Sequence, residues 1–252
     1  MHAITMPYKP MLFTALLVEA KKLRASLALL LALIAPTLIA VFVFFNLVRV
    51  DKAHPWDMVM LNAAAIWAFF MLPMSVTALT ALLAQTEHGP RAWDHLRALP
   101  VPRWHLYAAK AACVLAIVAA MSLALGVCTW LAVQAAMWFK PAITPTGAFD
   151  ALHFATLLAR MFAAAWLLVA VQLWIALRWN SFVPALATGI GGTFFAVVAT
   201  SAKIGVALPW QIPVNQLAPD PARAQLALVI GFTGGCIAFA AMLVDLARRE
   251  AG

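Results

Sequence analysis

Charge is the scarcest property of this sequence. Among its 252 residues only 10% are charged, and only nine are acidic. A soluble domain carries about 25% charged residues, so a large soluble domain is excluded. The chain is instead 65% hydrophobic, with a mean hydropathy of +0.95. This composition indicates an all-α polytopic membrane protein that forms a single domain over residues 1–252.

A nucleotide-binding loop is also missing. A P-loop requires a lysine followed by serine or threonine after a glycine-rich turn. The seven lysines are instead followed by other residue types, namely Pro10, Lys22, Leu23, Ala53, Ala111, Pro141 and Ile204. The chain therefore cannot hydrolyse ATP in the manner of a Walker-type ATPase.

Other catalytic and metal-binding patterns are absent as well. There is no G-x-S-x-G elbow, and Glu87-His88 is not followed by the second histidine of a zinc-protease motif. Cys113, Cys128 and Cys236 all fall inside apolar runs without C-x-x-C spacing, which indicates buried thiols. We therefore expect no catalytic residue, no bound metal and no bound cofactor, so the chain is not predicted to be an enzyme.

Acidic residues within apolar runs are nearly absent. Asp245, close to the end of the last run, is the one candidate, whereas ion-coupled transporters place ionisable groups near the membrane midplane. Asn62, Gln134 and Gln172 are the notable polar residues, and we expect them to form hydrogen bonds between helices. This pattern does not favour a proton- or sodium-coupled transporter.

Long apolar runs are what the sequence does contain. About 20 apolar residues are needed for a helix to cross the hydrocarbon core, and six runs meet this criterion. The predicted spans are residues 27–48, 59–84, 107–138, 153–177, 182–204 and 224–246. Arg160 falls inside the fourth span; a separate interfacial helix, an interior-facing arginine and snorkelling are all consistent with it, and snorkelling is favoured.

The distribution of Lys and Arg predicts the orientation. With the N-terminus in the cytoplasm, eleven basic residues lie inside and five lie outside, leaving Arg160 uncounted. The five outside residues are Arg49, Lys52, Lys140, Lys203 and Arg223. We therefore expect a plasma (inner) membrane protein with both termini cytoplasmic. Because the basic residues lie at the ends of apolar runs rather than in one patch, a nucleic-acid partner is not expected.

An amphipathic stretch precedes the first span. In residues 9–25, Leu12, Leu16 and Leu23 share one face, while the charged residues are expected to face water. Those charged residues are Glu19, Lys22 and Arg24. The stretch is predicted to be an interfacial helix, although a basic leader that only fixes the topology would have a similar composition.

Two further features lie in the second half of the chain. Residues 206–222 contain four prolines and are predicted to form a compact, irregular external cap. Pro209, Trp210 and Pro213 could form an outer gate there, or Trp210 could anchor the cap at the headgroup level. The Gly189-Ile190-Gly191-Gly192 cluster is interpreted as a helix-packing face or a local kink.

The most polar stretch of the chain, residues 85–106, separates the second and third spans. Its apolar residues Trp93, Leu96 and Leu99 recur at helical spacing. This spacing predicts a short helix with one apolar edge and a basic flank, on the same side of the membrane as the termini. Such a helix is suited to docking onto another protein.

This stretch resembles the cytoplasmic loop of type-2 ATP-binding-cassette (ABC) export permeases. The residues that carry the resemblance run in order from an acidic residue to a lysine that opens the third span: Glu87, Gly89, Trp93, Leu96, Leu99-Pro100-Val101, Arg103 and Lys110. Pro90 departs from the family pattern, which more often has a small or hydroxylated residue there. The short length and the Pro209-Trp210…Pro213 step resemble permeases of bacteriocin or lantibiotic immunity and of bacitracin resistance.

The resemblance implies a coupling helix that inserts into a groove on an ATPase subunit. It assigns this contact to a set of nine residues, with Trp93 as the main anchor and the arginines at the groove rim: Glu87, Gly89, Arg91, Trp93, Leu96, Arg97, Leu99, Pro100 and Arg103. ATP and Mg would bind in the partner subunit, and two permeases, alike or unlike, would pair with two ATPase subunits.

Two functions follow as hypotheses. The first is a permease subunit that exports an amphipathic peptide or a lipid-like compound, because the spans offer no charged pathway. The second is a non-transporting membrane sensor or scaffold that uses the same loop to recruit a cytoplasmic partner.

Overall fold

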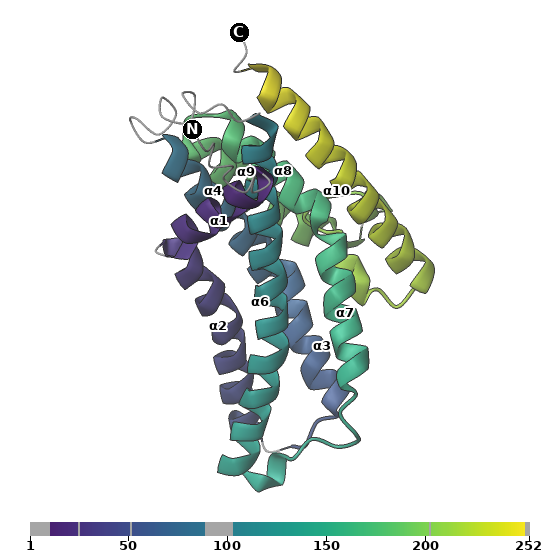
Figure 1. The fold of residues 1–252 in the computed structure, drawn as a ribbon. Helices are drawn as coiled ribbons and strands as arrows, with labels where there is room; N and C mark the ends of the chain where they lie inside the picture. Colours follow the sequence, from purple (N-terminus) through teal and green to yellow (C-terminus); the bar gives the residue numbers. More distant parts are fainter. Residues whose placement is uncertain (1–10, 25, 51, 89–102, 202, 250–252) are drawn as a thin grey trace, which may run out of the picture.

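The fold was analysed in a computed structural model, which describes residues 11–24, 26–50, 52–88, 103–201 and 203–249. Within these ranges the chain is helical and contains no strand (Figure 1). The principal helices run in chain order and share an elongated bundle: α1 (Met11–Arg24), α2 (Leu27–Arg49), α3 (Trp56–Ile66), α4 (Leu72–His88), α6 (Arg103–Phe139), α7 (Ala151–Ala164), α8 (Trp166–Arg178), α9 (Phe182–Val198) and α10 (Pro221–Arg249).

Short turns of other helix types join some of these helices. A π-helical turn lies between α3 and α4. One 3₁₀ turn follows α6, and three more lie within the segment that joins α9 to α10. They are η1 (Trp67–Met71), η2 (Pro141–Ile143), η3 (Ala199–Ser201), η4 (Lys203–Val206) and η5 (Val214–Leu217).

Five helical stretches are long and apolar enough to cross a membrane. They are Leu27–Arg49, Trp56–Gln85, Trp104–Phe139, Ala151–Arg178 and Pro221–Arg248, and Phe182–Val198 is a shorter sixth apolar helix. The prediction of an all-helical, multi-span membrane protein is confirmed. The predicted end of the fifth span at residue 204 is wrong.

The α-helix of the fifth span stops at Val198, and a 3₁₀ turn follows. The Thr200 hydroxyl donates to the carbonyl oxygens of Ala196 (3.2 Å) and Val197 (2.8 Å). These carbonyls belong to the last turn of α9, where the intrahelical donors run out, and Thr200 supplies a partner there.

The second span contains a π-helical turn at Trp67–Met71. Proline lacks a backbone N–H, and its ring clashes with the carbonyl four residues earlier. In a regular α-helix the ring of Pro73 would therefore clash with the carbonyl of Phe69. The backbone N–H of Leu72 bonds to the carbonyl of Trp67, five residues earlier. The extra residue in this turn accommodates the proline and keeps α3 and α4 in one continuous rod.

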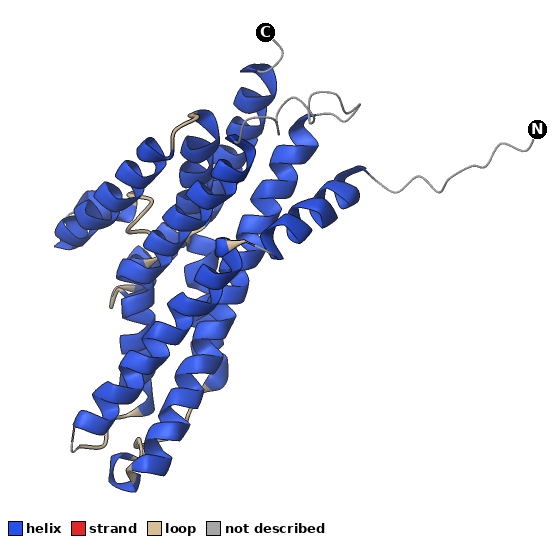
Figure 2. Cartoon of the chain, turned by 90° about the vertical axis from the view of Figure 1, so that its left-hand side faces the viewer, coloured by secondary structure: helices blue, strands red, loops and turns tan. Residues whose placement is uncertain are grey.

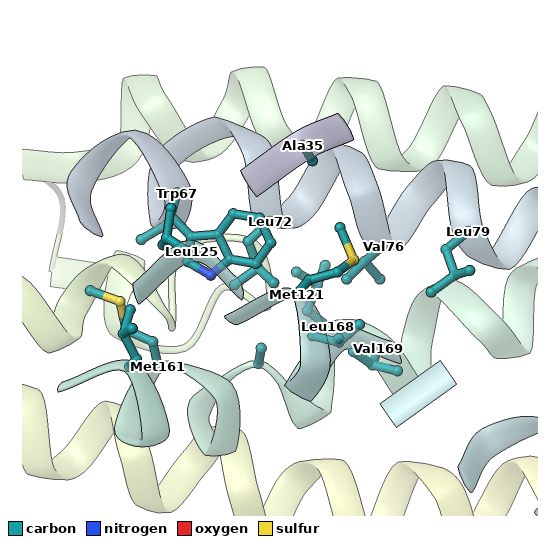
Figure 3. Close-up of a cluster of buried hydrophobic side chains, with 14 of the residues drawn as sticks. Ala35, Trp67, Leu72, Val76, Leu79, Met121, Leu125, Met161, Leu168 and Val169 are labelled. Atoms are coloured by element: carbon teal, nitrogen blue, oxygen red, sulfur yellow. The ribbon is translucent and has the colours of Figure 1, made fainter. Parts of the chain in front are cut away.

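The buried core gathers around this turn. The Trp67 side chain is fully buried, and Figure 3 shows it beside Leu72 and Leu125, with Met121 next to Val76. These residues come from η1, α4 and α6 and therefore fasten the second span to the third. Helices in lipid associate through such close packing, because lipid offers no hydrophobic gain between helices.

Helix α10 crosses the fourth span where that span is interrupted. Between α7 and α8, Ala165 forms a one-residue turn that stays in the αR region, with ψ at −7°. A Cβ atom on Gly231 would lie 2.2 Å from the Ala164 carbonyl oxygen, and one on Gly235 would lie 2.6 Å from the Trp166 Cβ. The two glycines, four residues apart, thus let the α10 backbone approach the interruption closely.

A buried polar cluster joins α4, α8 and α9. Gln172 Nε2 donates to the Thr77 hydroxyl (3.0 Å) and to the Ala185 carbonyl (3.1 Å), and the Thr188 hydroxyl donates to Gln172 Oε1 (3.2 Å). A Cβ on Gly189 would lie 2.1 Å from the Thr77 hydroxyl oxygen. The prediction that Gln172 bonds between helices is confirmed, and so is the packing role of Gly189.

The other two polar residues of that prediction behave differently. Asn62 and Gln134 make no side-chain hydrogen bond to the residues that the structure describes, and Asn62 is exposed. Gly191 also differs from its neighbours, because a Cβ there would meet open space.

Gly189 and Gly191 therefore form a matched pair for testing the cluster. Gly189→Ala should destabilise the protein by about 2 kcal/mol, because a methyl group there overpacks the contact with Thr77. Gly191→Ala should be neutral or slightly stabilising, since alanine favours the helix and meets no atom. Unfolding of each purified variant in mixed detergent micelles measures the difference. Equal stability of the two variants would contradict the packing role.

Candidate coupling site

Most of the predicted coupling residues lie outside the described part of the chain. These are Gly89, Arg91, Trp93, Leu96, Arg97, Leu99 and Pro100. Glu87 lies in the last turn of α4 and Arg103 is the first residue of α6; of these two only the backbone is described. The roles assigned to all nine residues therefore remain predictions.

The structure does place the two helices that flank this loop. The end of α4 and the start of α6 lie at the same end of the bundle as α1 and the C-terminal end of α10 (Figure 1). We call this end, defined by α1, His88 of α4 and Arg103 of α6, the coupling end. Any force on the intervening loop would be received by these elements.

Helix α1 lies obliquely to the long helices, at the side of the bundle (Figure 2). The next helix, α2, is capped by Ser26, whose hydroxyl accepts a bond from the Ala28 N–H (3.2 Å). Phe13, Leu17 and Val18 are exposed. Leu12 and Leu16 of the predicted apolar face are half-buried, and Leu16 packs against the core. A helix thus forms at the predicted position, and its place at the membrane interface stays a prediction.

Glu19 corrects the sequence-based picture of this helix. It was expected to face water, but its exposed fraction is only 3%. Its Oε2 lies 3.0 Å from Nζ of Lys110, which is 1% exposed, and its Oε1 lies 3.1 Å from Nζ of Lys22. Lys22 is partly exposed at the rim, whereas the side chain of Arg24 lies outside the described residues.

The Glu19–Lys110 pair ties α1 to α6. Transferring either charge alone into an apolar environment costs several kcal/mol, so each requires the other there. Lys110 lies two turns inside α6, a single α-helix of 37 residues. A displacement of the first turns of α6 must therefore carry α1 with it, or separate two buried charges.

The sequence contained a signal for this pair. Lys110 is the only lysine within the apolar third span, and Glu19 is the only acidic residue of α1. Residues of opposite charge in such surroundings predict a partner. The pairing itself was missed because 90 residues separate the two in sequence.

A second ion pair lies between α8 and α10. Arg178 and Asp245 are 2.5 Å apart, and Trp174 Nε1 donates to the same carboxylate oxygen of Asp245 at 2.9 Å. The one acidic residue of the sixth span thus joins α10 to α8. Because Arg178 ends α8, the tie also lies toward the coupling end.

At the other side of the fold, residues 204–217, which we call the returning segment, fold back against the bundle. Ile212 is fully buried and approaches α10 at Gly231, ten residues or about 15 Å along that helix. The predicted compact, irregular structure is confirmed. The segment, however, packs between helices and does not only cap them.

The three candidate gate residues occupy different positions in this segment. Pro213 is buried, and Pro209 and Trp210 are half-buried. A Cβ on Gly192 of α9 would lie 2.3 Å from the Trp210 ring. The indole N–H of Trp210 is buried as well. The ring therefore packs against α9, and both the outer gate and the headgroup-level anchor stay predictions.

Two arginines hold the returning segment. Arg160 of α7 donates to Gln216 Oε1 and to Gln225 Oε1, both at 3.3 Å. Arg223 of α10 donates to Asn215 Oδ1 at 2.8 Å. Arg160 thus has partners within the fold, as the interior-facing alternative predicts, whereas snorkelling stays a prediction. Amide oxygens on the returning segment and α10 provide its partners.

The described residues offer no group of three or more His, Cys, Asp or Glu side chains that could hold a metal ion. The three cysteines are unbonded thiols: Cys113 is buried, Cys128 is half-buried and Cys236 is exposed.

Comparison with known proteins gives one match. A family model described as ABC-2 family transporter protein matches residues 15–199, which include α2 to α9 and most of α1. No curated protein and no solved structure matches the chain.

The Glu19–Lys110 pair yields a prediction of stability. Lys110→Met should destabilise the protein by about 3 kcal/mol, because it leaves the Glu19 charge buried with, among the described residues, the partly exposed Lys22 as its remaining ion-pair partner. Lys22→Met is the matched control and should cost less than about 1 kcal/mol, as expected for a partly exposed pair. Unfolding in mixed micelles measures both. The double variant Glu19→Leu/Lys110→Met should recover most of the loss, and equal losses in the two single lysine variants would refute the tie.

Arg160 yields a prediction of local stability. Arg160→Leu removes the donor to Gln216 and Gln225, so amide hydrogen exchange in residues 205–217 should accelerate roughly tenfold, the equivalent of one to two hydrogen bonds. Arg49→Leu, at an exposed arginine that ends α2, is the control and should leave this exchange unchanged. Hydrogen–deuterium exchange with mass spectrometry reads the segment directly. An unchanged rate in Arg160→Leu would show that the arginine does not hold it.

Proposed function

The chain belongs to the ABC-2 transporter family and is thus a permease subunit of an ABC transporter; from that premise we propose that the transporter is an exporter. Its cargo would be an amphipathic peptide or a lipid-like compound, taken from the cytoplasm or the membrane. Such export would provide resistance to antimicrobial peptides.

The energy must come from a partner. The family implies association with an ABC ATPase subunit, and the sequence contains no P-loop lysine of its own. In the proposed complex, two copies of the ATPase subunit bind ATP and Mg and pair with two permeases, alike or unlike. ATP binding draws the ATPase subunits together and pushes on the loop between α4 and α6.

One observation carries this proposal: the elements at the coupling end are fastened to one another by buried charges. Lys110 of α6 binds Glu19 of α1, so a push on the loop reaches α6 and α1 as one unit. Because α6 is one unbroken helix, its movement extends along the bundle to Phe139. A rigid lever of this kind suits alternating access driven by a separate motor.

The proposed class of cargo rests on the pairing of charged side chains within the bundle. Lys110, Arg160 and Asp245 each have a partner within the fold. No charge among them is left to bind an ionic cargo, which favours a neutral or amphipathic compound. The returning segment, with Pro209, Trp210 and Pro213, would close the outer side of the pathway.

The proposed orientation places the coupling end in the cytoplasm of a plasma membrane. It rests on the excess of Lys and Arg on that side, eleven residues against five. Both termini would then be cytoplasmic, and the loop would meet the ATPase.

Loss of the anchor residues tests the proposal. In the complex expressed with its neighbouring ATPase, Trp93→Ala combined with Arg91→Glu should reduce co-purification of the ATPase at least tenfold, because aromatic anchors dominate such contacts. Trp138→Ala is the matched control: this tryptophan is 82% exposed and is the second-last residue of α6, at the helix end opposite Arg103. It should leave the complex and its ATPase activity intact.

Two results would contradict the proposal. One is undiminished co-purification in the double variant. The other is a complex whose ATP hydrolysis no compound stimulates and which moves none across vesicles, a result that would instead favour a sensor or scaffold.

A further inference from the structure

A recess lies between α2 and α3, near the end of the bundle opposite the coupling end. Its volume is about 440 Å³. Phe42, Met58 and Ile66 contribute apolar walls, and Asn46, Asn62 and His54 contribute polar groups. Apolar walls with a few convergent polar groups are the usual composition of a small-molecule site.

The two asparagines have no partner for their side-chain amides among the described residues. Both side chains are exposed and both line the recess, one from each helix. Asn46 lies three residues before the end of α2 and Asn62 six residues after the start of α3, about 5 and 9 Å along those helices. Both amides are therefore accessible to a ligand in the recess.

The chemistry of the recess defines what could satisfy these groups. Each asparagine amide offers two N–H donors and one carbonyl acceptor, and imidazole can both donate and accept. Among the residues that the structure describes, no Asp, Glu, Lys or Arg side chain lines the recess. A matching ligand group must therefore also donate and accept hydrogen bonds without carrying a charge, as amides and hydroxyls do, while an apolar tail covers the walls.

We infer that this recess binds the uncharged, amide- or hydroxyl-bearing headgroup of an amphiphile. The inference deepens the proposed function, since it rests on an amphiphilic cargo and names the headgroup that the permease recognises. Asn46 and Asn62 bind the headgroup from opposite helices, and the buried side chains of Val43 and Val59 line the bottom of the recess.

The larger groove between α6 and α7, about 480 Å³, provides a contrast. Its one hydroxyl side chain, Ser122, already donates to the Val118 carbonyl of its own helix at 2.9 Å. Apart from the indole N–H of Trp130, the described lining is apolar and contains no side-chain amide. Recognition of a headgroup therefore belongs to the α2–α3 recess.

Binding can be measured without the ATPase. In a chain with all three cysteines replaced by alanine, Met58→Cys carries an environment-sensitive fluorophore at the recess wall, and the protein is held in lipid nanodiscs. The probes are three amphiphiles with a 12-carbon tail: N-dodecanoylglycinamide, dodecyl glucoside and dodecyltrimethylammonium. The first two should bind saturably, whereas the ammonium compound should show only non-saturable partition into lipid.

Substitution of the asparagines should weaken the saturable binding. Asn46→Leu/Asn62→Leu should raise the Kd for the amide and glucoside probes roughly tenfold, as expected for losing one to two hydrogen bonds. Asn46→Gln/Asn62→Gln retains the amides and should keep part of the affinity, which separates loss of binding from misfolding. Asn180→Leu, at an exposed asparagine between α8 and α9, is the matched control and should bind as the parent does.

The outcomes are distinguishable. Stronger binding of the amide probe indicates a peptide cargo and stronger binding of the glucoside a glycolipid cargo, and either supports the inference. Equal responses to all three probes, an unchanged Kd in the double leucine variant, or disulfide cross-linking of unlabelled Met58→Cys between two copies would overturn it. None of these results depends on ATPase co-purification, so this inference and the proposed function can fail separately.

Discussion

An ionised side chain inside an apolar bundle has no water to solvate it, so it must find its partner within the protein. The chain contains few charges, and the buried ones determine how its helices are joined. Glu19 and Lys110 connect α1 to α6, and Arg178 and Asp245 connect α8 to α10. Arg160 reaches the returning segment. Each of these contacts joins elements that lie far apart in sequence.

Close contacts between helix backbones at glycines also join the helices. Gly231 and Gly235 bring α10 against the interruption between α7 and α8, and Gly189 brings α9 against Thr77. Lipid provides little driving force for helix association, so such contacts must supply it by packing and hydrogen bonding. Regular rods such as α6 therefore alternate with local interruptions, the π-turn before Pro73 and the break at Ala165.

This arrangement separates two tasks along the bundle. The coupling end is braced by ion pairs, as expected of a surface that receives force from an ATPase subunit. The recess between α2 and α3, toward the other end of the bundle, leaves Asn46 and Asn62 available. The long, unbroken α6 connects the two ends, from Arg103 to Phe139. A permease subunit needs both properties, rigidity where force enters and open polar groups where cargo is recognised.

The sequence by itself determined the class of protein, because hydropathy and helix length depend only on local composition. Six apolar helices, a helix before the first of them and the interhelical hydrogen bonds of Gln172 followed from the sequence. The resemblance in residues 85–106 led to the family, which the match over residues 15–199 confirmed. Only the tertiary structure decided which polar groups meet. Glu19 was expected in water and Arg160 at the membrane surface, since neither residue is close to its partner in sequence. The cost of an unpaired charge is evident in a sequence, but the position of its partner is set by how the helices pack.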